Sequence, residues 1–249
     1  MIVNDIFNYL NALFPVTDAM DFDNVGLLVG NGEKEVKKVL IALDCNLNTV
    51  DFAESLDCDL IITHHPVIFT PLKSVLSNSV IYKLIKNDIS VISMHTNLDV
   101  GVGGINDCLC KKIGISNITS VIASDGYLLK GGIIPETNAK TFAKALYDNL
   151  GGRIKYIDGE QSITKVLVCS GSGGEFLHDA KINDYDALVT ADIKHHQFLE
   201  AQDLKISLFD AGHFETEDII VEPLKKILSE KFDNVEFYTF HSDAIKYNW

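Results

Sequence analysis

The stretch KVLIALDCNLNTVDFAESLDCDLIITHH (38–65) decides the fold of this chain, because parts of its pattern return at an offset of 127 residues. At that offset KVLIALD (38–44) aligns with KVLVCSG (165–171), and CDLIITHH (58–65) aligns with YDALVTAD (185–192). Short apolar runs with polar ends are typical of buried parallel strands. We therefore predict an α/β fold that contains two related repeats.

A third apolar run follows in each copy, in ISVISMHTNLD (89–99) and in ISLFDAGHFETE (206–217), with nine residues fewer before it in the second copy. Strands that alternate with helices favour sheets that are parallel in the main. The first copy is expected to have strands at 38–44, 59–63 and 89–94 and helices near 48–56 and 79–87. The second copy is expected to have strands at 165–169, 186–190 and 206–209 and helices near 174–182, 195–203 and 216–230.

The repeats suggest a division of the chain into three parts. We predict a first α/β repeat at 1–111, a bridging segment at 112–163 and a second α/β repeat at 164–249. The bridging segment is less regular and contains the helix NAKTFAKALYDNL (138–150). A further amphipathic helix at the N-terminus is expected to end before Pro15.

The composition excludes several classes of function. With 249 residues, 47% of them hydrophobic, the chain can bury a sizeable core. A net charge of -14 and the lack of any basic run longer than two lysines argue against a nucleic-acid partner. We find neither a membrane-spanning apolar stretch nor the basic start of a signal peptide. The five cysteines favour buried free thiols, so we expect a cytoplasmic protein.

Residue types that commonly bind metals follow the apolar runs. In open parallel sheets, ligands bind at the carboxyl ends of the strands. The residues at these positions are His64, His65, His95, Asp99, His213 and Glu217. Several imidazoles and two carboxylates can hold two divalent metals if one carboxylate bridges them. The pattern therefore predicts a site at the strand ends.

Each motif also has a simpler explanation. The two histidines of THHP (63–66) can converge only if the chain turns there; otherwise one is a core histidine and the other is solvated. His95 and Asp99, four residues apart, suit Zn, Fe, Mn or Co, whereas Asn106 and Asp107 of the following GGIND could cap the next helix.

The second copy leaves similar alternatives open. The acidic residues and Thr216 of GHFETED (212–218) are typical of a helix start, but that explanation does not account for His213. His195 and His196, in TADIKHHQF (190–198), are either acid or base groups beside the site or the polar face of a helix.

Together, DNVGLLVG (23–30), LIITHHPVIF (60–69), HTNLD (95–99) with GGIND (103–107), and AGHFETE (211–217) resemble the GTP cyclohydrolase 1 type 2 homolog family, also called Nif-three-like. The resemblance covers nearly the whole chain. It implies two intertwined α/β repeats with mostly parallel, mixed sheets, a toroidal homohexamer and a dinuclear metal site. The family usually has Trp where this chain has Phe22, and the segment 112–163 is too short for the extra domain of longer members.

The resemblance also implies roles for individual residues. The metal ligands would be His64, His65, Asp99, His213 and Glu217. Asp99 would share one ion with His65, His213 would share the other with His64, and Glu217 would bridge both. His95 and His195 would be the catalytic groups near two divalent cations, which could be Zn, Fe, Mn or Co.

The implied activity is a metal-dependent hydrolase that opens the imidazole ring of GTP and releases formate. The small-molecule substrate would then be a nucleotide, but the chain has no P-loop, and a phosphoester or another cyclic amide would need the same metals. The alternative is a non-catalytic, metal-binding hexamer that acts in protein interaction or metal handling.

Overall fold

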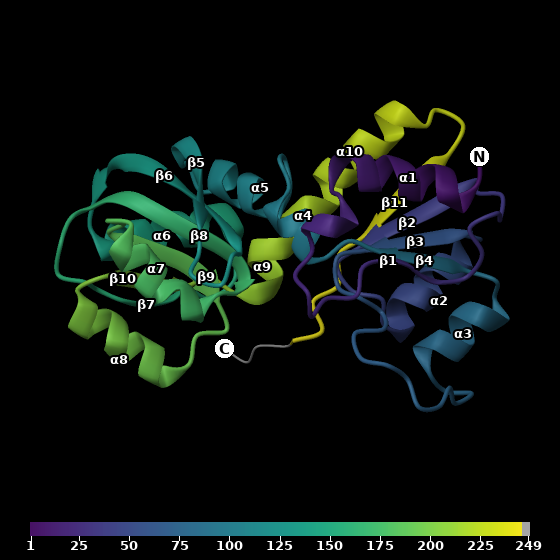
Figure 1. Ribbon diagram of the computed structural model, residues 1–249, viewed down its shortest axis with the longest axis horizontal. Helices are drawn as coiled ribbons and strands as arrows, with labels where there is room; N and C mark the ends of the chain where they lie inside the picture. Colours follow the sequence, from purple (N-terminus) through teal and green to yellow (C-terminus); the bar gives the residue numbers. More distant parts are fainter. Residues whose placement is uncertain (246–249) are drawn as a thin grey trace. The chain divides into compact units, whose positions relative to one another are not determined.

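The computed structural model describes residues 1–245, which form two compact units (Figure 1). Unit 1 contains Met1–Gly101 and the segment that begins at Ile220, and unit 2 contains Val102–Ile219. Each unit has its own β-sheet, so the predicted α/β class is confirmed. No helix within the described residues is long and apolar enough to span a membrane.

The sheet of unit 1 has five strands in the order β1-β4-β3-β2-β11. Their bounds are β1 (Gly26–Val29), β2 (Lys38–Ala42), β3 (Leu60–Thr63), β4 (Ser90–Ser93) and β11 (Glu236–Phe240). Strands β2, β3, β4 and β11 run parallel, and β1 pairs antiparallel with β4. All residues of β3 and β4 are buried, as expected for strands covered on both faces.

Helices cover both faces of this sheet, with α1 and α10 on one side and α2 and α3 on the other (Figure 1). Their bounds are α1 (Val3–Leu13), η1 (Val16–Asp18), α2 (Leu47–Ser55), α3 (Val80–Lys86), α4 (Thr96–Val100) and α10 (Val221–Lys231). Helix α1 ends before Pro15, as predicted, and Asn46 caps α2 by accepting the backbone N–H of Thr49.

The sheet of unit 2 has six strands in the order β5-β6-β8-β9-β10-β7. They are β5 (Ser116–Ile122), β6 (Leu128–Thr137), β7 (Lys155–Ile157), β8 (Ile163–Ser172), β9 (Ala187–Ala191) and β10 (Ser207–Asp210). The helical elements are α5 (Ile105–Lys112), α6 (Ala139–Leu150), η2 (Gly174–Phe176), α7 (Leu177–Ile182), α8 (His195–Leu204), α9 (His213–Glu217) and η3 (Asp218–Ile220). Only β8, β9 and β10 run parallel to one another.

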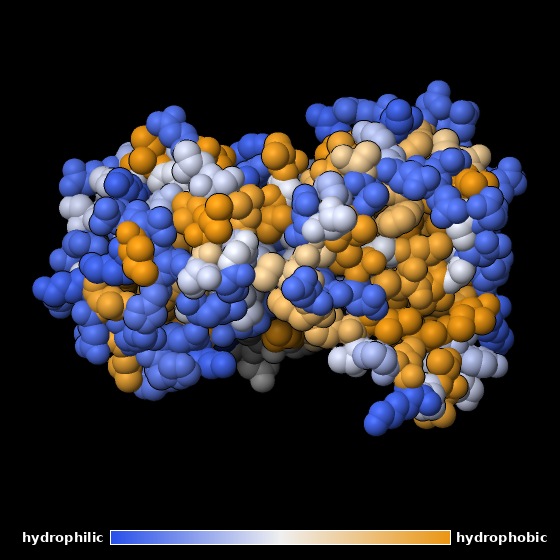
Figure 2. All heavy atoms as spheres, in the orientation of Figure 1, coloured by the Kyte–Doolittle hydropathy of each residue, from blue (hydrophilic) through white to orange (hydrophobic). Residues whose placement is uncertain are grey.

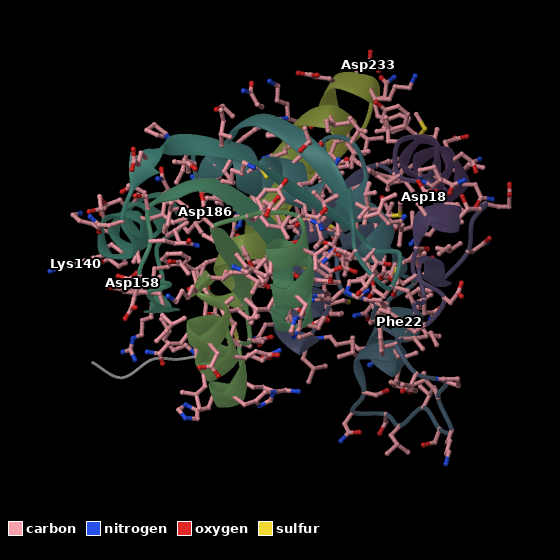
Figure 3. All side chains as sticks on the ribbon, turned by 60° about the vertical axis from the view of Figure 1, so that its left-hand side comes forward. Asp18, Phe22, Lys140, Asp158, Asp186 and Asp233 are labelled. Carbon is pink, nitrogen blue, oxygen red and sulfur yellow. The ribbon has the colours of Figure 1, made fainter. Side chains whose placement is uncertain are left out.

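The predicted duplication appears as the same arrangement in both sheets. Strands β2, β3 and β4 are parallel neighbours with antiparallel β1 beyond β4, and β8, β9 and β10 are parallel neighbours with antiparallel β7 beyond β10. The aligned aspartates also act alike, because Asp59 Oδ2 accepts the N–H of Lys38 at 3.1 Å and Asp186 Oδ2 accepts the N–H of Lys165 at 2.8 Å. Figure 3 labels Asp186. Each aspartate ties the second strand of its copy to the start of the first.

The compact units begin and end at other residues than the predicted repeats. The segment 112–163, expected to be irregular, supplies β5, β6 and β7 to the sheet of unit 2, and the segment after Ile220 supplies α10 and β11 to unit 1. These pairings join strands that are distant in the sequence. A sequence repeat and a compact unit are different divisions of a chain, so the repeat boundaries stay a prediction.

One predicted helix, at 216–230, is divided into α9, η3 and α10. Pro223 lies in the first turn of α10, where a missing N–H is tolerated. A continuous helix would have used the N–H of residue 223 for a hydrogen bond to the carbonyl of Ile219. The break leaves α9 as a separate short helix that carries His213 and Glu217.

Candidate metal centre

Unit 1 brings three histidines together at the carboxyl ends of β3 and β4. His64 and His65 follow β3, and His95 follows β4 as the N-cap residue of α4. Their ligand atoms all lie within 4.8 Å of one another. The ring centroids of His64 and His65 are 4.8 Å apart, and those of His64 and His95 are 4.9 Å apart. The three imidazoles therefore form one group that could hold a metal ion.

A turn after β3 makes this grouping of adjacent histidines possible. Thr63 Oγ1 donates to the carbonyl of His65 at 2.9 Å, and the N–H of His65 donates to the carbonyl of Leu43 at 3.1 Å. The chain therefore leaves the straight path of the strand, which would have pointed successive side chains to opposite faces. The explanation with one core and one solvated histidine is not needed.

Each imidazole of this group is held through its Nδ1 atom. The acceptors are the Met94 carbonyl for His64 at 3.0 Å, Asp44 Oδ1 for His65 at 2.8 Å and Asp23 Oδ1 for His95 at 2.8 Å. A carbonyl or carboxylate oxygen can only accept, so this network assigns the proton to Nδ1 and leaves a lone pair on Nε2. Histidines that bind metals are commonly oriented in this way.

Asp99 adds a carboxylate to the three imidazoles. It lies in α4, is buried, and places Oδ1 3.7 Å from Nε2 of His64. This contact favours His64 as the residue that shares an ion with Asp99. The pairing of Asp99 with His65, which the resemblance implied, stays a prediction.

Asp23 holds His95 in place, and sequence reasoning missed it. Its buried side chain accepts from His95 Nδ1, from the backbone N–H of Thr96 at 3.0 Å and from Thr96 Oγ1 at 2.6 Å. Burial raises the pKa of this carboxyl, but the hydrogen bonds from His95 and Thr96 outweigh it and lower the pKa to about 2. The available signal was the position of Asp23 in the DN pair of the family motif.

Phe22, which precedes Asp23, lies at the surface of unit 1, where 64% of the residue is exposed (Figure 3). Its ring centroid is 6.4 Å from that of Phe69, whose residue is 49% exposed. Figure 2 shows that hydrophobic side chains gather on the visible face of unit 1. The replacement of Trp by Phe therefore affects an exposed aromatic pair, not a buried core.

Unit 2 holds a second group on the short helix α9. His213 and Glu217 lie one turn apart, and His213 Nε2 is 2.9 Å from Glu217 Oε2. His213 Nδ1 is 2.6 Å from Asp192 Oδ2, at the end of β9. Burial lowers the pKa of His213, but its hydrogen bonds to Glu217 and Asp192 and their charges outweigh burial and raise the pKa to about 9. Without a cation, this imidazole is protonated at neutral pH.

Gly171 leaves room for the Glu217 carboxylate because it has no side chain. Gly171 has φ +59°, and a Cβ there would lie 2.1 Å from Glu217 Oε1 and 3.2 Å from His213 Nε2. The backbone around it is fixed, since Thr190 Oγ1 donates to the Gly171 carbonyl at 2.9 Å and Thr216 Oγ1 accepts the Gly171 N–H at 3.1 Å. Thr216 lies inside α9 and does not cap it, so that explanation of the residue is wrong.

The sequence profile of the family described as Duf34/NIF3 (NGG1p interacting factor 3) matches residues 1–246 of this chain. This chain belongs to the Duf34/NIF3 family. It is 32% identical over 249 residues to the GTP cyclohydrolase 1 type 2 homolog of Clostridium perfringens, covering 95% of both chains. It is 34% identical over 238 residues to the protein of the same name in Campylobacter jejuni, covering 92% of both chains.

Solved structures agree with the family assignment. A hypothetical protein of Staphylococcus aureus superposes with a TM-score of 0.93 at 28% identity, covering 100% of this chain and 99% of that one. Reduced HcgD from Methanocaldococcus jannaschii superposes with a TM-score of 0.84 at 28% identity, covering 96% and 97%. The resemblance drawn from the motifs is confirmed.

Other predicted positions of this NIF3-family chain lie elsewhere. His195 and His196 are exposed at the start of α8, and neither joins a group of metal-binding residue types within the part of the chain that the structure describes. Asn106 does not cap α5; its Oδ1 accepts the N–H of Ser170 at 2.8 Å and ties α5 to β8. Asp107 Oδ2 accepts the N–H of Gly103 at 2.7 Å. A catalytic role for His195 stays a prediction.

The cysteines are free thiols, as predicted, but only Cys58, Cys110 and Cys169 are buried, whereas Cys45 and Cys108 are half-buried. All five are free, and burial raises the pKa of Cys45, Cys58 and Cys110 to about 12. These thiols are protonated at neutral pH, and thiolate is the form that binds metals. The candidate ligands are therefore imidazoles and carboxylates, a donor set that fits a borderline divalent cation.

Proposed function

We propose that this chain binds two divalent cations through His64, His65, Asp99, His213 and Glu217. The observation that carries the proposal is the shared arrangement of the histidines. His64, His65 and His213 each engage an acceptor through Nδ1, at 3.0, 2.8 and 2.6 Å. The Nε2 atoms of His64 and His213 then lie beside carboxylate oxygens of Asp99 and Glu217. This geometry fits a ligand set for Zn, Fe, Mn or Co.

In this proposal each cation is held by more than one of these ligands. His64 and Asp99 hold one ion, His65 and His213 hold the other, and Glu217 bridges them. The family match over residues 1–246 supports this, because it includes the motifs of both units. A substitution of the bridging residue Glu217 is therefore expected to weaken the binding of both ions.

The activity that we propose is hydrolysis of a nucleotide. The curated relatives carry the name GTP cyclohydrolase 1 type 2 homolog, and the reaction that the resemblance implies is opening of the guanine imidazole ring with release of formate. Bound divalent cations supply Lewis-acid activation of water and of the substrate. His95 then accepts a proton at Nε2, and His195 is the second candidate for proton transfer. Asp99 and Glu217 supply negative charge that balances the cations.

A second candidate function is favoured by the family description, which names an NGG1p interacting factor. In that case the chain is a metal-binding interaction or metal-handling protein without turnover. Both candidates share a toroidal homohexamer in the cytoplasm as their expected form. They differ in one respect: the hydrolase loses turnover when Glu217 is changed to Gln, whereas the interaction protein has no turnover to lose.

The first experiment is metal content per chain in protein purified without chelators. We expect about two divalent ions per chain in the wild type and loss of at least one in Glu217→Gln. The matched control is Glu200→Gln, because Glu200 forms a similar carboxylate–imidazole pair with His178 at 2.7 Å on the exposed surface. An unchanged metal content in Glu217→Gln would refute the bridging role. Formate release from GTP by the metal-loaded protein then separates the two functions.

A further inference from the structure

The two oxygen atoms of the Asp23 carboxylate have different partners. Oδ1 faces His95 Nδ1 at 2.8 Å and also accepts the N–H of Asn24 at 2.8 Å. Oδ2 accepts two donors from Thr96, the backbone N–H at 3.0 Å and the hydroxyl at 2.6 Å. The hydroxyl has no freedom to reverse, because its oxygen already accepts the N–H of Met20 at 3.0 Å. The carboxylate is therefore fixed as an acceptor on both sides.

We propose that Asp23 is a positioning residue that sets the tautomer of His95, with the proton on Nδ1 and the lone pair on Nε2. The ligand atoms of His64, His65 and His95 lie within 4.8 Å of one another, and Nε2 is the ring nitrogen of His95 that Asp23 does not engage. Asp23 thereby makes His95 a proton acceptor toward a substrate or water in this space. This role rests on the proposed function, in which His95 moves a proton.

The substitution Asp23→Asn reverses this tautomer for a simple reason. The amide oxygen of Asn is expected to stay toward Thr96, where it keeps two donors, the backbone N–H and the hydroxyl, whereas the other side offers one fixed donor, the N–H of Asn24. Each unmatched buried donor costs about 1–3 kcal/mol. The amide NH2 then faces His95 Nδ1. A neutral imidazole meets this donor by accepting at Nδ1 and carrying its proton on Nε2. His95 would then point a donor at the site, with almost no change in shape.

Asp44 offers a matched control in the same unit. Its Oδ1 lies 2.8 Å from His65 Nδ1, and its side chain is 42% exposed. No other hydrogen bond to the Asp44 carboxylate occurs among the described residues. In Asp44→Asn the amide can therefore rotate its oxygen toward His65 Nδ1. The tautomer of His65 is therefore expected to stay as in the wild type, although Asp44→Asn is the same change of side chain as Asp23→Asn.

The test is long-range ¹H–¹⁵N NMR of the histidine side chains in the full-length, metal-free chain. The spectrum separates imidazoles that carry the proton on Nδ1 from those that carry it on Nε2, and His95→Gln assigns the signals of His95. We expect Nδ1–H for His95 in the wild type and Nε2–H in Asp23→Asn. His65 should keep Nδ1–H in Asp44→Asn. Nε2–H on His95 in the wild type would overturn the proposal even if the variant failed to fold.

The same variants distinguish this inference from the proposed function. In metal-loaded protein, Asp23→Asn should keep its metal content and the KM, while kcat falls by roughly 10²-fold or more, as for loss of a general base. The exposed control Glu200→Gln, whose carboxylate pairs with His178 away from the site, should show no such fall in kcat. If the wild type binds no metal or turns over no substrate, the proposed function fails while the NMR result still decides the role of Asp23. An unchanged His95 tautomer in folded Asp23→Asn refutes that role alone.

Discussion

The substitution Gly171→Ala should weaken metal binding with little loss of stability. Residue 171 has φ +59°, where an L-residue with a Cβ costs about 1–2 kcal/mol. The added Cβ would also lie 2.1 Å from Glu217 Oε1. The carboxylate must retreat by about 1 Å to restore an ordinary contact. Glu217 is buried and has little room to move. A displacement of this size would break its contact with His213 Nε2, which lies 2.9 Å from Glu217 Oε2.

The two effects can be measured separately. The strained backbone of Gly171→Ala is expected to lower the free energy of unfolding of the metal-free protein, measured in urea, by about 1 kcal/mol. The displacement of Glu217 is expected to raise the Kd for Zn²⁺ roughly 10- to 100-fold, as measured by competition with a chelating dye. Gly114→Ala is the control, because residue 114 has φ +83° and a Cβ there would meet nothing within 4 Å. It should lose stability and keep its metal affinity.

Either of two results would contradict a role of the Gly171 contact in metal binding. If Gly171→Ala binds Zn²⁺ as tightly as the wild type, Glu217 is not held against Gly171 for metal binding. If Gly114→Ala loses affinity to the same extent, the effect comes from general destabilisation and not from the contact with Glu217 Oε1.

Three further predictions follow from the ionisable groups. The pKa of Asp23 is lowered from 3.8 to about 2, so Asp23→Asn should cost about 2 kcal/mol of unfolding free energy above pH 4, and this difference should vanish as the pH falls through 2. The pKa of His213 is about 9, so a cation must displace its proton, and the Zn²⁺ affinity of the apo chain should rise about tenfold per pH unit between pH 7 and 9; a flat profile would exclude His213 as a ligand. Burial raises the pKa of Cys110 to about 12, so iodoacetamide at pH 8 should leave it unmodified until urea unfolds unit 2; rapid labelling of the native chain would contradict its burial.

Most of the strands could be predicted because each is a local property of the sequence. The apolar runs at 38–44, 59–63 and 89–94 contain β2, β3 and β4 as short buried strands. Their distant partners could not be predicted in the same way. Strand β11 pairs with β2 across nearly the whole chain, and Phe237 is the one buried residue among its five, so the strand lacks the continuous buried run of β3 and β4. Pairing of this kind depends on tertiary packing that no local pattern records.

The candidate ligands could be predicted from residue type and spacing, but the groups that orient them could not. Asp44 ends the apolar run 38–44, and Asp23 lies in a turn 72 residues before His95. An aspartate in such a place is most often a solvated turn or capping residue. Only the folded chain shows that Asp23 has a buried side chain and accepts from His95 and Thr96.

The duplication explains why the two copies orient their histidines differently. At the offset of 127 residues, Asp44 aligns with Gly171 and His65 aligns with Asp192. In the first copy the carboxylate of Asp44 orients the imidazole of His65. In the second copy the carboxylate belongs to Asp192, the residue that aligns with His65, and it orients His213. Gly171, which aligns with Asp44, leaves the space that Glu217 occupies. Exchanging Gly171 for the Asp of the first copy would place a second carboxylate against Glu217, so the divergence of the two copies is a requirement of the proposed metal site.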